Sequence, residues 1–136
     1  MTVMQLSQAA QEKLEELRSQ HYHDEDMYNF IEEYSEYEFV EYYEAYVDMA
    51  EEYDYEAVDA FVDNFGIENI ASFPDSYNGR WDSFQSFVEA VFPDIYGPIP
   101  EQLLNYIDWA KVTDEWEYDY EWTPRSGETL VFLRNF

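Results

Sequence analysis

The chain of 136 residues contains no cysteine, and it has only 6 Lys plus Arg against 32 Asp plus Glu. Without Cys there is no disulfide framework, no thiolate nucleophile and no Cys-based zinc site. The shortage of Lys and Arg excludes nucleic-acid binding through a basic patch, because neutralising phosphates requires clustered cations. Docking on an anionic membrane surface is excluded for the same reason.

Long apolar runs and linker-like segments are also missing. No apolar run approaches the length of a membrane-spanning helix, and the N-terminus lacks a basic stretch followed by an apolar block. We therefore expect a soluble, cytoplasmic protein. With only 4 Gly and 5 Pro, the chain offers no low-complexity linker.

The net charge of -26 does not predict disorder, because 46% of the residues are hydrophobic and 21% are aromatic. Disordered acidic chains are poor in both kinds of residue. The 14 Tyr, 10 Phe and 4 Trp supply large rings for a core. We expect a folded domain whose own charge repulsion lowers its stability.

Apolar residues at helical spacing predict amphipathic helices over the first half of the chain. Ser35, with Glu38 three residues later, predicts a capping box; Asp54 predicts another N-cap, and Gly66 a helix end. The stripes are Leu6, Ala9, Ala10, Leu14 and Leu17 in a helix over 4–20; Met27, Phe30, Ile31 and Tyr34; Phe39, Val40, Tyr43, Val47 and Ala50; and Ala57, Val58, Phe61, Val62 and Phe65.

The remainder predicts turns, short helices and a terminal β-hairpin. Turn signals occupy 73–75 and 77–79. Asp82 or Ser83 should cap a helix, and Pro93, Pro98 and Pro100 should break the chain around Gly97. A short helix should follow Pro100, and Asp108 should cap another that runs to Trp116.

Period-two alternation over 118–122 and β-rich residues over 129–133 predict the hairpin, which must pack on the preceding helices to be stable. The predicted fold class is α+β, mainly α. It has an N-terminal helix in 1–23, an acidic helical region over 24–70 and a helix-plus-hairpin region over 71–136.

Enzymatic and metal-binding motifs are weak. Phosphate loops, nucleophile elbows and H-E-x-x-H motifs are missing, and no carboxylate pair stands out among so many acids. His21 and His23 lie beside Asp24 and Asp26 and could ligate zinc or nickel, but an exposed helix end is the much simpler explanation. We expect no enzyme activity, no metal site and no cofactor.

The most informative feature is a dense series of acids. From Ser19 to Gly79 the chain has 18 Asp or Glu and no Lys or Arg. The densest part, here called the acidic run, holds 14 acids. They are Asp24, Glu25, Asp26, Glu32, Glu33, Glu36, Glu38, Glu41, Glu44, Asp48, Glu51, Glu52, Asp54 and Glu56.

If wholly helical, the acidic run would extend about 50 Å, with one charge per about 3.5 Å. A single strand of B-DNA carries one phosphate per about 3.4 Å. The run falls between the apolar stripes, so its carboxylates can project outward and form a face that imitates DNA. A plain solvated surface is the alternative, although such surfaces usually mix both signs of charge. The tyrosines either fill the core or, as we expect for Tyr42, Tyr46, Tyr53 and Tyr55, lie half exposed and add ring faces to a binding surface.

The second half of the sequence resembles the ArdA antirestriction family. The resemblance is carried by Tyr77–Ser83 followed by Phe84 and Phe87, by Ile99–Leu103 leading into Asn105–Trp109, and by Val131–Phe136. It is strongest over residues 55–136 and looser over 24–54, where composition and spacing are similar. Family members usually begin with a β-rich domain, and in its place residues 1–23 offer one helix. The Arg that commonly follows the Asn-Tyr-Ile-Asp helix is replaced by Val112-Thr113-Asp114.

This resemblance implies a DNA mimic that inhibits type I restriction-modification enzymes by occupying the DNA groove of their specificity and methylation subunits. It also implies a homodimer formed through the C-terminal part, an origin on a phage or mobile element, and action in a bacterial host cell. A second hypothesis remains open. An acidic interaction module can instead sequester another basic nucleic-acid-binding protein, such as a histone-like factor or a CRISPR effector.

Overall fold

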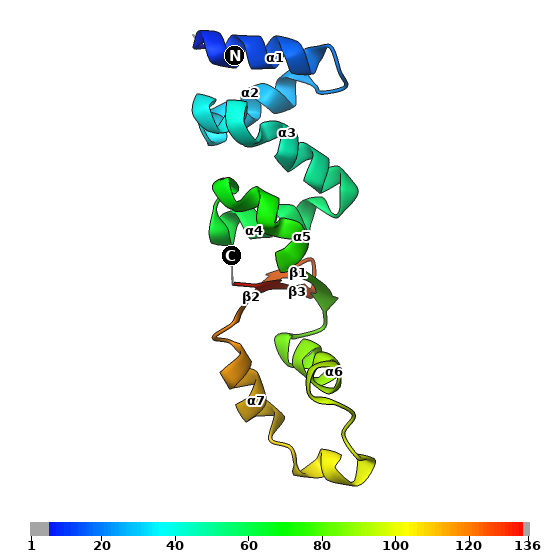
Figure 1. Ribbon diagram of the computed structural model, residues 1–136. Coiled ribbons are helices and arrows are strands. Elements are labelled where there is room, and N and C mark those ends of the chain that lie inside the picture. The colour runs from blue at the N-terminus through cyan, green and yellow to red at the C-terminus, as the bar shows by residue number, and fades with distance from the viewer. Residues whose placement is uncertain (1–5, 135–136) are drawn as a thin grey trace.

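The computed structural model describes residues 6–134 and is elongated, with a small sheet between two groups of helices (Figure 1). On one side of the sheet lie α1 (Gln8–Arg18), α2 (Asp24–Glu33), α3 (Glu36–Glu52), α4 (Tyr55–Phe65), the 3-10 helix η1 (Ile67–Ser72) and α5 (Phe73–Ser76). On the other side lie α6 (Phe84–Tyr96), the 3-10 helix η2 (Glu101–Tyr106) and α7 (Trp109–Trp116). The predicted α+β, mainly α class is confirmed. Within the described residues, no helix is both long enough and apolar enough to cross a membrane.

The predicted caps of the helices are present. Ser35 accepts a hydrogen bond from the backbone N–H of Glu38 at 3.0 Å, and Asp54 accepts one from Glu56 at 3.1 Å. Asp108 caps α7 through the N–H of Lys111 at 3.2 Å. These side chains satisfy N–H groups that have no partner within the helix, so each fixes where its helix begins.

The sheet is antiparallel and contains β1 (Tyr77–Trp81), β2 (Tyr120–Arg125) and β3 (Glu128–Leu133) in the order β1-β3-β2. The predicted hairpin corresponds to β2 and β3. The prediction of a turn at 77–79 is wrong, because this segment is strand β1. Gly79 has φ +93 there, and the pairing with β3 shifts between Tyr77 and Arg80. A local turn signature therefore marks an irregular strand, whose pairing partner lies some fifty residues further along the chain.

Helix α6 contains Pro93 and continues to Tyr96, so the chain breaks at Gly97 as predicted. A proline in the last turn removes one hydrogen bond, the one to the carbonyl of residue 89. Glu89 is exposed, so water can satisfy that carbonyl. Gly97, with φ +98, ends the helix.

The core has two parts that meet at the central strand. Leu130 and Phe132 of β3 belong to the larger cluster, together with residues from α1 to α5. Val131, between them, belongs to the smaller cluster with Phe87 and Trp116. Successive side chains of a strand point to opposite faces, so β3 joins both clusters and is buried on both sides.

Every residue of the predicted apolar stripes is buried or partly buried except Ala9. Ala9 is exposed, whereas Ala10, Leu14 and Leu17 form the inner face of α1. Tyr46, expected to be half exposed, is only 9% exposed, because its ring packs 5.7 Å from that of Phe30. The large number of rings in this part of the chain extends the core further around α3 than the aliphatic stripe indicates.

Candidate functional site

None of the fourteen carboxylates of the acidic run is buried. They lie on α2, on α3 and at the start of α4, which are successive layers along the long axis of the molecule (Figure 1). The nine exposed ones are Asp24, Glu25, Asp26, Glu32, Glu33, Glu41, Asp48, Glu51 and Glu52. Glu36, Glu38, Glu44, Asp54 and Glu56 are partly exposed.

Helix α3 concentrates its acids on one face. At about 100° per residue, five of its carboxylates fall within about 100° of arc around the helix axis. The face opposite to this arc holds Phe39, Tyr43 and Tyr46, which are buried. We call the five acids the α3 stripe: Glu41, Glu44, Asp48, Glu51 and Glu52.

The acids of α3 extend the charge-density comparison to an observed helix. The 17 residues of α3 measure about 25 Å at about 1.5 Å per residue. Seven acids over that length, namely the stripe with Glu36 and Glu38, give one charge per about 3.6 Å, against about 3.4 Å for the phosphates of one DNA strand. The acidic run as a whole is shorter than the 50 Å of a single helix, because it is divided among three helices.

Neutral donors position Asp48 and Glu36, two carboxylates of the run that lie away from the sheet. The Tyr22 hydroxyl donates to Asp48 at 2.7 Å, and the backbone N–H of Ser7 donates to Glu36 at 2.8 Å. Burial and the neighbouring Asp48 carboxylate raise the pKa of Tyr22, so the phenol stays protonated and remains a donor. Neutral donors restrict the position of a carboxylate without cancelling its charge.

Other carboxylates of the run are paired with cations. Lys13 lies 3.3 Å from Glu44, and Arg18 lies 2.7 Å from Asp24. Arg80, on β1, binds both Asp54 and Glu56, the latter at 3.1 Å. These pairs reduce the negative charge at four members of the run, two of them beside the sheet.

Glu56 receives a second contact, from the opposite end of the chain. The Ser126 hydroxyl donates to it at 2.6 Å, and this hydrogen bond, followed by those from Arg80, lowers the pKa of the Glu56 carboxyl. Asp54 and Glu56 therefore fasten α4 to the sheet, a role that their positions in the sequence did not indicate.

The acidic surface continues beyond the predicted run onto α4. Asp59 and Asp63 lie one turn apart, and burial together with the Asp63 charge raises the pKa of Asp59. Arg125 pairs with Asp63 at 3.1 Å and acts on Asp59 in the opposite sense. The absence of Lys and Arg up to Gly79 was the signal that the acidic region extends past Glu56.

The two histidines do not come together with Asp24 and Asp26. His21 instead lies near Asp48 and Glu51 of α3, where one ligand atom from each is within 4.8 Å of the others. All three side chains are exposed, and the distance from the His21 Nε2 to Glu51 is 3.9 Å. His23 occupies the N-cap position of α2 without a side-chain capping bond.

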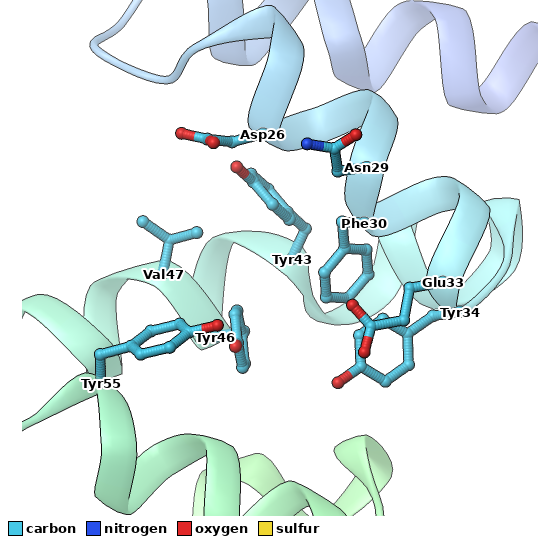
Figure 2. A pocket seen from close by; sticks show the side chains of 9 residues that line it. All are labelled: Asp26, Asn29, Phe30, Glu33, Tyr34, Tyr43, Tyr46, Val47 and Tyr55. Atoms are coloured by element: carbon cyan, nitrogen blue, oxygen red, sulfur yellow. The ribbon is translucent and has the colours of Figure 1, made fainter.

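A pocket of about 450 Å³ opens between α2, α3 and α4 (Figure 2). Sequence reasoning did not find it, since each helix contributes only part of its wall. We call it the tyrosine pocket, and it is lined by Asp26, Asn29, Phe30, Glu33, Tyr34, Tyr43, Tyr46, Val47 and Tyr55.

The aromatic rings of the tyrosine pocket are in contact with one another. Phe30 lies 4.4 Å from Tyr34 and 5.0 Å from Tyr43 between ring centroids, and Tyr46 lies 6.5 Å from Tyr55. Burial raises the pKa of Tyr34 and of Tyr43 to about 12, and it raises the pKa of Tyr46 further. These phenols are therefore neutral at physiological pH.

The chain matches no protein-family model, no curated protein and no solved structure. The likeness to the ArdA family therefore depends on the sequence segments given above.

Proposed function

We propose that this protein is a DNA-mimic inhibitor that occupies the DNA-binding groove of a host defence enzyme. The first candidate for this enzyme is a type I restriction-modification complex. The observation that carries the proposal is the density of acids on α3, where seven carboxylates, five of them on the one face of the α3 stripe, follow the helix at nearly the spacing of phosphates along a strand. The elongated arrangement of the acidic layers supports it, because a DNA groove is long and lined with cations (Figure 1).

Pairing with basic residues does not cancel this charge. The chain has 6 basic residues against 32 acids, so most carboxylates have no cation to pair with. A cationic groove would attract such a surface over long range and accelerate encounter. The positions of Asp48 and Glu36 are restricted by neutral donors, which reduces the ordering cost of binding.

A competition experiment tests the proposal directly. A labelled duplex that contains the recognition site is bound to the purified specificity and methylation subunits, and the chain is titrated in. We expect the duplex to be displaced, and the concentration needed should rise in proportion to the duplex concentration. A ternary complex, in which chain and duplex bind without mutual loss, would contradict the mimic.

The same experiment with a histone-like protein in place of the restriction enzyme separates the two hypotheses. A specific mimic should displace DNA from the restriction subunits at much lower concentrations than from the histone-like protein. Equal displacement would favour the general sequestering module.

We also propose that the protein forms a homodimer through its C-terminal part. Large apolar side chains are exposed at the end of the molecule formed by α6 and η2, where self-association would cover them. They include Ile95, Tyr96, Leu103, Leu104 and Tyr106. Light scattering coupled to size exclusion should give twice the chain mass of 16.4 kDa, and Tyr106→Ser with Leu104→Ser should return the monomer.

A further inference from the structure

The tyrosine pocket has the chemistry of a site for an organic cation. Its lining contains the carboxylates of Asp26 and Glu33 and no Lys, Arg or His. Aromatic faces carry partial negative charge and attract cations, most strongly where water is excluded. An anionic ligand would meet repulsion from both carboxylates, and a purely apolar one would leave their charge without a partner.

The hydroxyl of Tyr43 is a further polar group at the pocket. Tyr43 is only 3% exposed as a whole residue, and it lines the pocket. Figure 2 shows this hydroxyl at the pocket, on the side of the Asp26 carboxylate. Here the hydroxyl can accept a hydrogen bond from a donor that enters the pocket.

The arrangement of the polar groups favours a planar, many-donor cation. Figure 2 shows Asp26 and Glu33 at separate places along α2, with the rings of Tyr34, Tyr46 and Tyr55 around the space beside them. A guanidinium group has five N–H donors in one plane, stacks on aromatic faces and is more weakly hydrated than an ammonium group. It can therefore pair with one of these carboxylates and stack on a ring face at the same time.

We propose that the tyrosine pocket receives the guanidinium group of an arginine side chain from the protein partner. The inference rests on the proposed function, because a DNA-binding groove supplies arginines that face the acidic layers. A volume of about 450 Å³ is ample for one arginine side chain and lies within the range of small-ligand sites.

A titration of the free protein tests the pocket without any partner. The probe is N-acetyl-arginine methylamide, followed by NMR of the tyrosine rings, with the neutral isostere N-acetyl-citrulline methylamide as control. We expect saturable shifts at Tyr34, Tyr43, Tyr46 and Tyr55 with the arginine compound and none with the citrulline compound. No saturable shift at these rings would overturn the proposal.

Charge-matched variants separate the pocket from the general acidity of the protein. The double variant Asp26→Asn with Glu33→Gln removes both pocket carboxylates. The control Glu25→Gln with Glu32→Gln removes two exposed carboxylates of the same helix that do not line the pocket. We expect arginine binding to weaken about tenfold or more in the first and less than about twofold in the second. Equal weakening would mean that only net charge matters, and the proposal would fail.

A second matched pair tests the aromatic wall. Tyr55 lines the pocket and is 61% exposed, whereas Tyr37 is 67% exposed, lies at the start of α3 and is outside the lining. Both can be changed to Leu without opening the core. Tyr55→Leu should weaken arginine binding several-fold, and Tyr37→Leu should leave it unchanged. The reverse order would overturn the assignment.

Two further measurements fix the source of the cation and keep this proposal distinct from the proposed function. The blocked peptide Gly-Gly-Arg-Gly-Gly should bind at least as well as the free propylguanidinium ion. Binding of the free ion alone would overturn the assignment to a protein side chain.

If the arginine peptide binds while the chain fails to displace DNA from the restriction subunits, the mimic is refuted and the arginine pocket stands. If DNA is displaced and arginine does not bind, the arginine pocket is refuted and the mimic stands.

Discussion

Asp59 illustrates, at the scale of a residue, how the charge of this protein opposes its stability. Burial and the nearby Asp63 raise the pKa of the Asp59 carboxyl, so folding favours its protonated form. Its contribution to stability is therefore fully present below the unfolded-state pKa, near 4, and is lost as the pH rises through the folded-state pKa. At neutral pH the ionised Asp59 is a net cost.

Replacing this carboxylate should make the protein more stable. We expect Asp59→Asn to raise the free energy of unfolding at pH 7 by about 0.5 kcal/mol, a modest gain because water screens a partly exposed group. The control is Glu52→Gln, which removes an exposed charge and reports only the relief of general repulsion. Urea unfolding followed by circular dichroism measures both. A gain no larger than that of Glu52→Gln, or one that does not shrink as the pH is lowered toward the folded-state pKa, would contradict the account.

Arg80 stabilises the fold, because it holds three carboxylates from two elements together. It binds Asp54 and Glu56 at the start of α4, and Glu128 of β3 lies 3.8 Å away. Removing it would leave these acids close together without a cation. The expected loss for Arg80→Met is about 1–2 kcal/mol, below that of a fully buried pair because the site is partly exposed.

Arg18 provides the comparison for Arg80. It forms a single exposed pair with Asp24, so Arg18→Met removes the same charge with little structural consequence. Thermal unfolding should place the midpoint of Arg80→Met several degrees below that of Arg18→Met. Equal midpoints would mean that the contacts of Arg80 add nothing beyond its charge.

At the scale of elements, helices were predictable where local signals sufficed. Ser35, Asp54 and Asp108 marked helix starts correctly because a cap involves only neighbouring residues. Strand β1 was missed because its pairing with β3 is long-range, while its Asn78-Gly79 sequence reads locally as a turn.

The acidic residues of the candidate site were predictable from the sequence, but their contacts with other elements were not. The sequence identified the acids of α2 and α3 and their outward placement. It could not indicate that Arg80 and Ser126 would draw Asp54 and Glu56 toward the sheet, since these contacts join residues far apart in the chain. The tyrosine pocket needs three helices, so no single stripe revealed it.

The α3 stripe leads to a prediction about how binding is distributed. If many carboxylates share the contact, any single change such as Glu41→Gln should weaken inhibition less than about threefold, because each is partly screened by water. Changing Glu41, Asp48, Glu51 and Glu52 together to their amides should abolish it at physiological salt. The control changes four exposed acids outside the acidic layers, namely Glu89, Glu101, Asp114 and Glu115. Equal loss in both quadruple variants, measured by DNA displacement, would mean that the stripe has no special role.

At the scale of the whole molecule, charge acts in opposite directions on folding and on binding. The net charge of -26 makes the folded chain repel itself, and this repulsion is strongest at low ionic strength. The attraction to a cationic groove is also strongest there. The Debye length falls from about 10 Å at 0.1 M salt to about 3 Å at 1 M, so added salt weakens both effects.

Salt should therefore stabilise the free protein and weaken its complex. We expect the unfolding midpoint to rise between about 20 mM and about 500 mM NaCl. Over this range the Debye length falls from about 20 Å to about 4 Å. Over the same range the affinity for the restriction subunits should fall by about tenfold or more. Sucrose, which favours the compact state without screening charge, should raise the midpoint and leave the affinity nearly unchanged. If affinity and midpoint rise together with salt, the contact is apolar, and the acidic layers are a solvated surface instead of an imitation of DNA.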